Sequence, residues 1–143
     1  MKAPMEATLT GDGKYSILTD ELEYHNPDTD YVVSVPRGFV TDLASVPRLF
    51  WMAFPPCGKY TPPAVVHDYL YWEQPASCDR ECADNILLKA MEEAGVSLAT
   101  RKSIYVGVRT GGESSWNDNK ALKARGVIRN VPEKYMEFSP YES

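Results

Sequence analysis

A change of hydrophobic pattern near residue 62 limits the folds that this chain can adopt. Before that point, short runs rich in β-branched and aromatic residues alternate with turn residues, as in Tyr31 to Val35 followed by Pro36-Arg37-Gly38. After it, apolar residues recur at the spacing of an α-helix. This order predicts an α+β protein, with a short N-terminal antiparallel β meander followed by a bundle of about three helices.

Capping residues and glycines set the expected bounds of the helices. Thr61 is a suitable cap for the first helix, and Pro62 or Pro63 fits its first turn. Ser77 or Asp79 is expected to cap the second helix. The third helix is expected to stop at Gly111-Gly112. The expected ranges are about 61–72, 79–94 and 98–109, with a short further piece at 116–124.

The 143 residues suit a single domain, residues 1–143. Within it, the loop before the first helix is rich in proline and aromatic residues and is expected to pack onto the domain, with one helical turn near Arg48 to Ala53. The parts in order are a β-rich part (1–42), this loop (43–61), a helical part (62–125) and an extended tail (126–143).

The net charge of -5 argues against broad nucleic-acid binding, which needs a basic face. No apolar run reaches the roughly 20 residues that span a bilayer, and no signal peptide is recognisable, so no transmembrane segment is expected. The cysteines Cys57, Cys78 and Cys82 follow no regular framework, which predicts reduced thiols. A zinc site at the second and third cysteines, or one disulfide with one free thiol, is left open.

The first helix carries His67, Asp68 and Tyr71. His67 and Tyr71 share a face because they lie four residues apart, and Asp68 points about 100° further round. The imidazole can act as a general base on water, the carboxylate can bind a hard cation such as Ca²⁺, and the phenol can bond to a carboxylate. Asp84 on the second helix would approach His67 if the two helices are antiparallel, and would then hold the imidazole in one tautomer.

A structural interpretation stands beside this catalytic one, because a buried histidine bonded to an aspartate is often only a satisfied core pair. Further polar positions have the same two interpretations. Arg80 and Arg109 can bind a phosphate or carboxylate, or they can pair with an acid. The acids considered for them are Asp42, Asp84 and Glu81. Asp42 can face His67 or cap a turn. Three tyrosines can line a pocket or belong to the core, and they are Tyr60, Tyr69 and Tyr105.

Several separated motifs run through most of the chain. They are Phe39-Val40-Thr41-Asp42-Leu43-Ala44-Ser45-Val46-Pro47, His67-Asp68-Tyr69-Leu70-Tyr71, Arg80 with Ala83-Asp84, and Tyr105 with Val108-Arg109 and Gly111-Gly112. In this order they resemble a family found in bacteriophages and prophages, catalogued as domain of unknown function 1353. The resemblance implies a phage origin, and it implies no established activity.

A second, local resemblance covers about residues 58–91. His67-Asp68-x-x-Tyr71 followed by Ala83-Asp84 is similar to the paired helices of secreted and parvoviral phospholipases A2. This resemblance implies that His67 activates water, that Asp68 binds Ca²⁺, and that Tyr71 and Asp84 form a hydrogen-bonded support. The chain departs from that family in its glycine-rich calcium loop, of which only Gly58 is present, and in its disulfide framework.

Three functions follow as hypotheses. The first is a phage-encoded hydrolase, in which water activated by His67 attacks an ester in a lipid or cell-envelope substrate. The second is a non-enzymatic tail or virion component whose partners are other virion proteins. The third is an intracellular phage protein that binds a host factor or a small signalling molecule. All three expect synthesis in the host cytoplasm, and the first two allow assembly into the virion.

Overall fold

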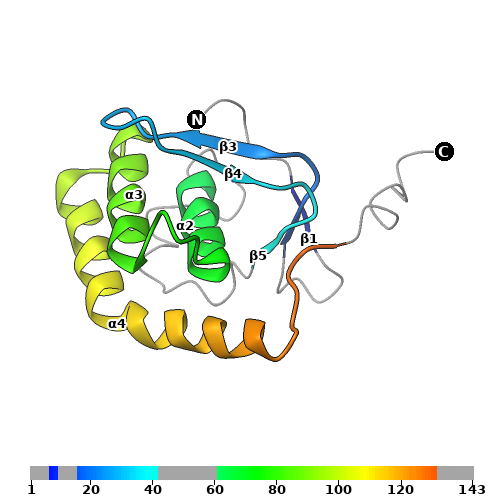
Figure 1. Cartoon of the computed structure of the whole chain (residues 1–143). Helices are drawn as coiled ribbons and strands as arrows, with labels where there is room; N and C mark the ends of the chain where they lie inside the picture. Colours follow the sequence, from blue (N-terminus) through cyan, green and yellow to red (C-terminus); the bar gives the residue numbers. More distant parts are fainter. Residues whose placement is uncertain (1–6, 10–15, 42–60, 132–143) are drawn as a thin grey trace.

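The computed structural model describes residues 7–9, 16–41 and 61–131 (Figure 1). These residues form short strands ahead of longer helices, which confirms the predicted α+β class. The strands are β1 (Ala7–Leu9), β2 (Ser16–Leu18), β3 (Leu22–His25), β4 (Val32–Val35) and β5 (Val40–Thr41). The helices are α2 (Thr61–Glu73), α3 (Arg80–Glu93) and α4 (Leu98–Ala124).

The described strands form two antiparallel sheets and not one continuous meander. β5 returns to pair with β2, so that Ile17 lies opposite Val40, and the strand order of that sheet is β1-β2-β5. β3 and β4 form a separate hairpin, in which Tyr24 lies opposite Val33. The predicted strands do not include β3, although its four residues alternate between apolar and polar and Leu22 and Tyr24 are buried in the core.

α2 lies at the centre of the domain, where it contacts strands β4 and β5 as well as both α3 and α4 (Figure 1). Val65, Val66 and Leu70 are buried in the core. Tyr69 packs edge-to-face on Phe39, with 5.2 Å between the ring centroids. A helix that is surrounded in this way holds its polar side chains inside the fold, where each of them needs a partner.

α3 begins at one of the two capping residues predicted for it. The Asp79 carboxylate accepts a hydrogen bond of 2.9 Å from the Cys82 amide and so satisfies an unpaired donor of the first turn. Cys78 and Cys82 are joined by a disulfide, with their Cα atoms 5.2 Å apart. The prediction of reduced thiols is therefore wrong for this pair, because a spacing of four across a helix start brings the two side chains together.

α4 is a single helix of 27 residues, so the predicted stop at Gly111-Gly112 is wrong. The ribbon changes direction near its middle, and its first half lies beside α3 while its second half crosses the end of α2 (Figure 1). Gly112 is buried, and a Cβ atom at this position would lie 2.4 Å from the hydroxyl of Tyr71. The glycine is therefore required for the close approach of α4 to α2 and does not end the helix.

The second half of α4 supplies hydrogen bonds to the C-terminus of α2. Lys123 Nζ donates to the carbonyl oxygen of Glu73 at 2.8 Å, and Asn119 Nδ2 donates to that of Tyr71 at 3.2 Å. These bonds satisfy carbonyls at the end of α2 and place a positive charge at the negative end of the helix dipole. The last turn of α2 is thereby fixed against α4.

Residues 127–131, called the C-terminal segment below, run back from α4 to the strands. The amide of Val40 donates to the carbonyl of Arg129 at 2.7 Å, and the amide of Val131 donates to that of Gly38 at 2.8 Å. A β-bridge joins Phe39 and Asn130 between these two bonds. The C-terminal segment therefore pairs with the chain that leads into β5.

Some predictions fall on parts of the chain that the structure does not describe. These are the helical turn near 48–53, the tail from residue 132, and the positions Asp42, Cys57 and Tyr60. None of the helices that the structure describes is both long enough and apolar enough to cross a membrane.

Candidate functional site

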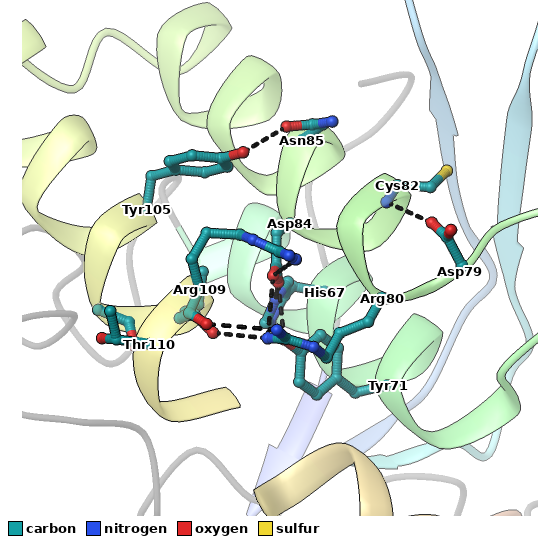
Figure 2. A network of polar contacts seen from close by, with 12 residues as sticks. His67, Tyr71, Asp79, Arg80, Cys82, Asp84, Asn85, Tyr105, Arg109 and Thr110 are labelled. Atoms are coloured by element: carbon teal, nitrogen blue, oxygen red, sulfur yellow. Dashed lines mark hydrogen bonds and ion pairs between the residues drawn. The ribbon is translucent and has the colours of Figure 1, made fainter. Parts of the chain in front are cut away.

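Asp84 is the centre of a network of polar side chains that comes from all three described helices (Figure 2). It lies in the second turn of α3, and its side chain is 0% exposed. Its Oδ1 accepts hydrogen bonds from His67 Nε2 and from the Tyr71 hydroxyl, both at 2.7 Å. His67 and Tyr71 lie on successive turns of α2, so the spacing of four puts both within reach of one carboxylate oxygen.

The second oxygen of Asp84 faces two guanidinium groups. Arg109 Nη1, from α4, donates to Oδ2 at 2.8 Å, and Arg80 Nη1 lies 3.5 Å from the same oxygen. Arg80 makes shorter bonds to the backbone of α4, donating to the carbonyl of Val108 at 3.0 Å and to that of Arg109 at 3.3 Å. Both arginines therefore pair with an acid, which is one of the two interpretations of these positions.

Asp84 keeps its negative charge although it is buried. Burial alone raises the pKa of a carboxyl group, but hydrogen bonds from His67, Tyr71 and Arg109 outweigh it and lower the pKa of Asp84 below its ordinary value. Burial also raises the pKa of the Tyr71 phenol, and there it is not outweighed, so the phenol keeps its proton. The centre of the network is thus a buried carboxylate surrounded by donors.

His67 has one ring nitrogen fixed by Asp84. Because a carboxylate only accepts hydrogen bonds, the proton of the neutral imidazole lies on Nε2, and Nδ1 carries a lone pair. No residue in the described part of the chain bonds to Nδ1. The side chain is 12% exposed, and its ring lies 4.2 Å from that of Tyr71, centroid to centroid. An imidazole held in this tautomer can take a proton from water.

Asp68 takes no part in this network and is neutralised by an arginine. Arg129 donates to Oδ2 at 2.6 Å and to Oδ1 at 3.3 Å, and the Thr41 hydroxyl donates to Oδ2 at 2.7 Å. The guanidinium also lies over the rings of Phe39 and Trp72, 5.0 and 5.3 Å from their centroids. Sequence reasoning missed Arg129 because 61 positions separate it from Asp68, and only the path of the C-terminal segment brings them together.

The residues around Asp68 do not fit the calcium site that the resemblance implies. Ca²⁺ takes roughly six to eight oxygen ligands, whereas a guanidinium already bonds to both oxygens of Asp68. In the described ranges, no three or more His, Cys, Asp or Glu side chains gather where they could hold a metal ion. Gly58 lies outside those ranges. Calcium binding therefore stays a prediction without support from the contacts of Asp68.

The remaining predicted positions lie beside the network or outside the described residues. Tyr105 donates its hydroxyl proton to Asn85 Oδ1 at 2.9 Å, and Figure 2 shows this bond apart from Asp84. Asp42 and Tyr60 belong to the part of the chain that the structure does not describe. Gly112 lets α4 approach the network, a role that the sequence does not distinguish from that of a glycine at a helix end.

The fold and the network define a small α+β protein whose described helices pack around a partly buried histidine bonded to a buried aspartate. The chain belongs to the family described as Protein of unknown function (DUF1353), which matches residues 16–108. The matched region includes His67 and Asp84 and ends one residue before Arg109. No curated protein and no solved structure matches the chain.

Proposed function

We propose that this chain is a phage-encoded hydrolase in which His67 activates a water molecule for attack on an ester. The observation that carries the proposal is the 2.7 Å hydrogen bond between His67 Nε2 and the fully buried Asp84. This bond orients the imidazole, fixes its tautomer and stabilises its protonated form. Tyr71 bonds to the same oxygen of Asp84, so Tyr71 and Asp84 are positioning residues for the base.

The proposed reaction moves one proton through His67. The water oxygen adds to the carbonyl carbon of the ester while Nδ1 of His67 takes a proton from the water. The tetrahedral intermediate then collapses, the bond to the alcohol oxygen breaks, and that oxygen takes the proton back from the imidazolium. The products are an acid and an alcohol, and Asp84 stays ionised throughout.

Two resemblances support the details of this proposal. The local similarity to phospholipases A2 supports the roles given to His67, Tyr71 and Asp84, and it favours a lipid or cell-envelope ester as the substrate. The phage origin rests on the order of motifs along the chain. At Asp68, the ion pair with Arg129 stands where that resemblance would place a calcium ligand, so the requirement for calcium is a variable of the test.

The test compares wild type with His67→Gln on a panel of soluble and vesicle-bound esters, with Ca²⁺ and with EDTA. We expect His67→Gln to lower kcat by roughly a hundredfold to ten-thousandfold, because the general base is lost. His25 is the other histidine of the chain and lies exposed on β3, so His25→Gln is the matched control and should keep the wild-type rate.

Two outcomes would contradict the hydrolase proposal. One is the absence of turnover by the wild type on every ester in both conditions. The other is an equal rate in wild type and in a folded His67→Gln variant, which would assign the turnover to a contaminant or to another site. Circular dichroism and urea unfolding of both variants separate loss of the base from loss of the fold.

The second candidate function is the non-enzymatic virion component. It is favoured by the fact that Asp84 connects all three described helices, an arrangement that stabilises a bundle whether or not a reaction occurs. On this proposal His67→Gln lowers stability and changes no catalytic rate. The same ester panel, combined with incorporation of the variant into particles, distinguishes the two functions.

A further inference from the structure

Arg109 uses only part of its hydrogen-bonding capacity within the network. A guanidinium carries several N–H donors, and its Nε–Nη2 edge can hold two oxygens side by side. Arg109 donates a hydrogen bond from Nη1 to Asp84, and no side chain or carbonyl in the described part of the chain accepts one from its Nε or Nη2. Its side chain is 30% exposed.

The local charges favour an anion at this edge. The single carboxylate of Asp84 faces the guanidinium groups of both Arg80 and Arg109. Glu81 also attracts Arg109, but the two side chains are too far apart to form an ion pair. A guanidinium that is partly buried attracts an anion more strongly than a fully exposed lysine does, because the effective dielectric constant around it is lower.

Arg80 holds the backbone at Arg109 in place and uses its own donors on that backbone. Its Nη2 donates to the carbonyl oxygen of Arg109 itself at 3.3 Å, and its Nη1 donates to that of Val108 at 3.0 Å. These bonds fix the stretch of α4 backbone from which the Arg109 side chain extends. An arginine anchored at both its backbone and its Nη1 loses less conformational entropy when it binds a ligand.

We propose that the Nε–Nη2 edge of Arg109 binds a phosphate-type oxyanion carried by the substrate of the His67 site. His67 and Arg109 bond to the two oxygens of one carboxylate, which places both side chains beside Asp84. Phosphate is favoured over carboxylate because it carries more negative charge, and two guanidinium groups contribute to the field here. The link to catalysis rests on the hydrolase proposal, whereas anion binding by itself does not require turnover.

The experiment is a calorimetric titration of the full chain with inorganic phosphate at constant ionic strength. We expect saturable binding by the wild type and binding that is about tenfold weaker or worse in Arg109→Gln, because the charged fork is lost. Arg109→Lys keeps a positive charge beside Asp84 but lacks the fork, so it should fold and still bind more weakly than the wild type. Lys102→Gln removes an equal charge from the exposed surface of α4 and should bind like the wild type.

The source of the phosphate is identified by two further arms with the same variants, glycerol 1-phosphate and vesicles of phosphatidylglycerol. Arg109-dependent binding of the soluble ester indicates a soluble substrate, and Arg109-dependent binding of the vesicles alone indicates a lipid headgroup. Either result supports the proposal. No saturable binding of any probe, or equal binding by the wild type and Arg109→Gln, would overturn it. Arg109-dependent phosphate binding without hydrolysis of any ester would end the hydrolase proposal and leave the anion site standing.

Discussion

At the scale of the residue, Asp84 is the group whose charge the network most depends on. Replacing it by Asn removes the counter-charge of two guanidinium groups, and we expect Asp84→Asn to lower the free energy of unfolding by about 3 kcal/mol at neutral pH. Folding lowers the pKa of this carboxyl, so its contribution is fully present above the ordinary value of 3.8 and is lost as the pH falls through the lower folded value. Urea unfolding between pH 7 and pH 3 measures both effects.

The pH dependence separates Asp84 from the other carboxyl groups of the chain. We expect the wild type to lose more stability than Asp84→Asn does below about pH 4, because the variant lacks the group that titrates there. Asp118 is exposed on α4, and Asp118→Asn is the matched control, with stability and pH slope close to those of the wild type. Parallel pH slopes for wild type and Asp84→Asn would show that folding does not lower the pKa of Asp84.

The sequence predicts the residues of this network only where their spacing is local. His67 and Tyr71 are placed on one face by a spacing of four, and a short helical hairpin is enough to bring Asp84 to them. Arg109 has its partner among the acids considered for it, but the spacing alone does not choose Asp84. The choice depends on the packing of α4 against α3, which no local pattern in the sequence encodes.

At the scale of the element, α3 and α4 start at capping residues, whereas the end of α4 depends on packing. Asp79, one of the two predicted caps, caps α3 because its side chain accepts a hydrogen bond from an amide of the first turn. Gly111-Gly112 is typical of a helix end, yet α4 continues through it to Ala124. A glycine that is needed for close approach and one that ends a helix look the same in a sequence.

The adjacent glycines of α4 give a matched pair of substitutions. Gly112→Ala would place a Cβ 2.4 Å from the Tyr71 hydroxyl, and we expect it to lower the free energy of unfolding by about 1–3 kcal/mol. A Cβ at Gly111 meets nothing within 4 Å, and Gly111→Ala should raise that free energy by up to about 1 kcal/mol through helix propensity. Urea unfolding of the two variants measures the difference, and destabilisation by both to the same extent would argue against the close contact of α4 with Tyr71.

At the scale of the whole molecule, the C-terminal segment connects the last helix, the strands and the helix that carries the site. Arg129 donates from Nε to the carbonyl of Val40 at 2.9 Å and from both terminal nitrogens to Asp68. The region matched by the family ends at residue 108, so this connection lies beyond it. The sequence gives no means of predicting the contact, because an arginine in a polar stretch fits any acidic partner.

We expect Arg129 to act as the cation that neutralises Asp68 in the folded protein. Arg129→Gln should lower the free energy of unfolding by roughly 2 kcal/mol, since it removes charged hydrogen bonds at a partly buried pair. In a double-mutant cycle with Asp68→Asn, the coupling should reach about 1 kcal/mol, because each change removes the same contact. Urea unfolding of the four proteins gives both quantities.

A control variant and the effect of calcium on stability test whether Arg129 alone neutralises Asp68. Arg125 is exposed and lies four positions earlier, so Arg125→Gln should unfold like the wild type. Because a guanidinium already bonds to both oxygens of Asp68, neither millimolar Ca²⁺ nor EDTA should change the melting temperature of the wild type. A ligand that binds only the folded state raises that temperature, so a rise with Ca²⁺ that is lost in Asp68→Asn would mean that calcium displaces Arg129. That result would restore Asp68 as a metal ligand and would make the C-terminal segment a part of the protein that must move to admit the metal.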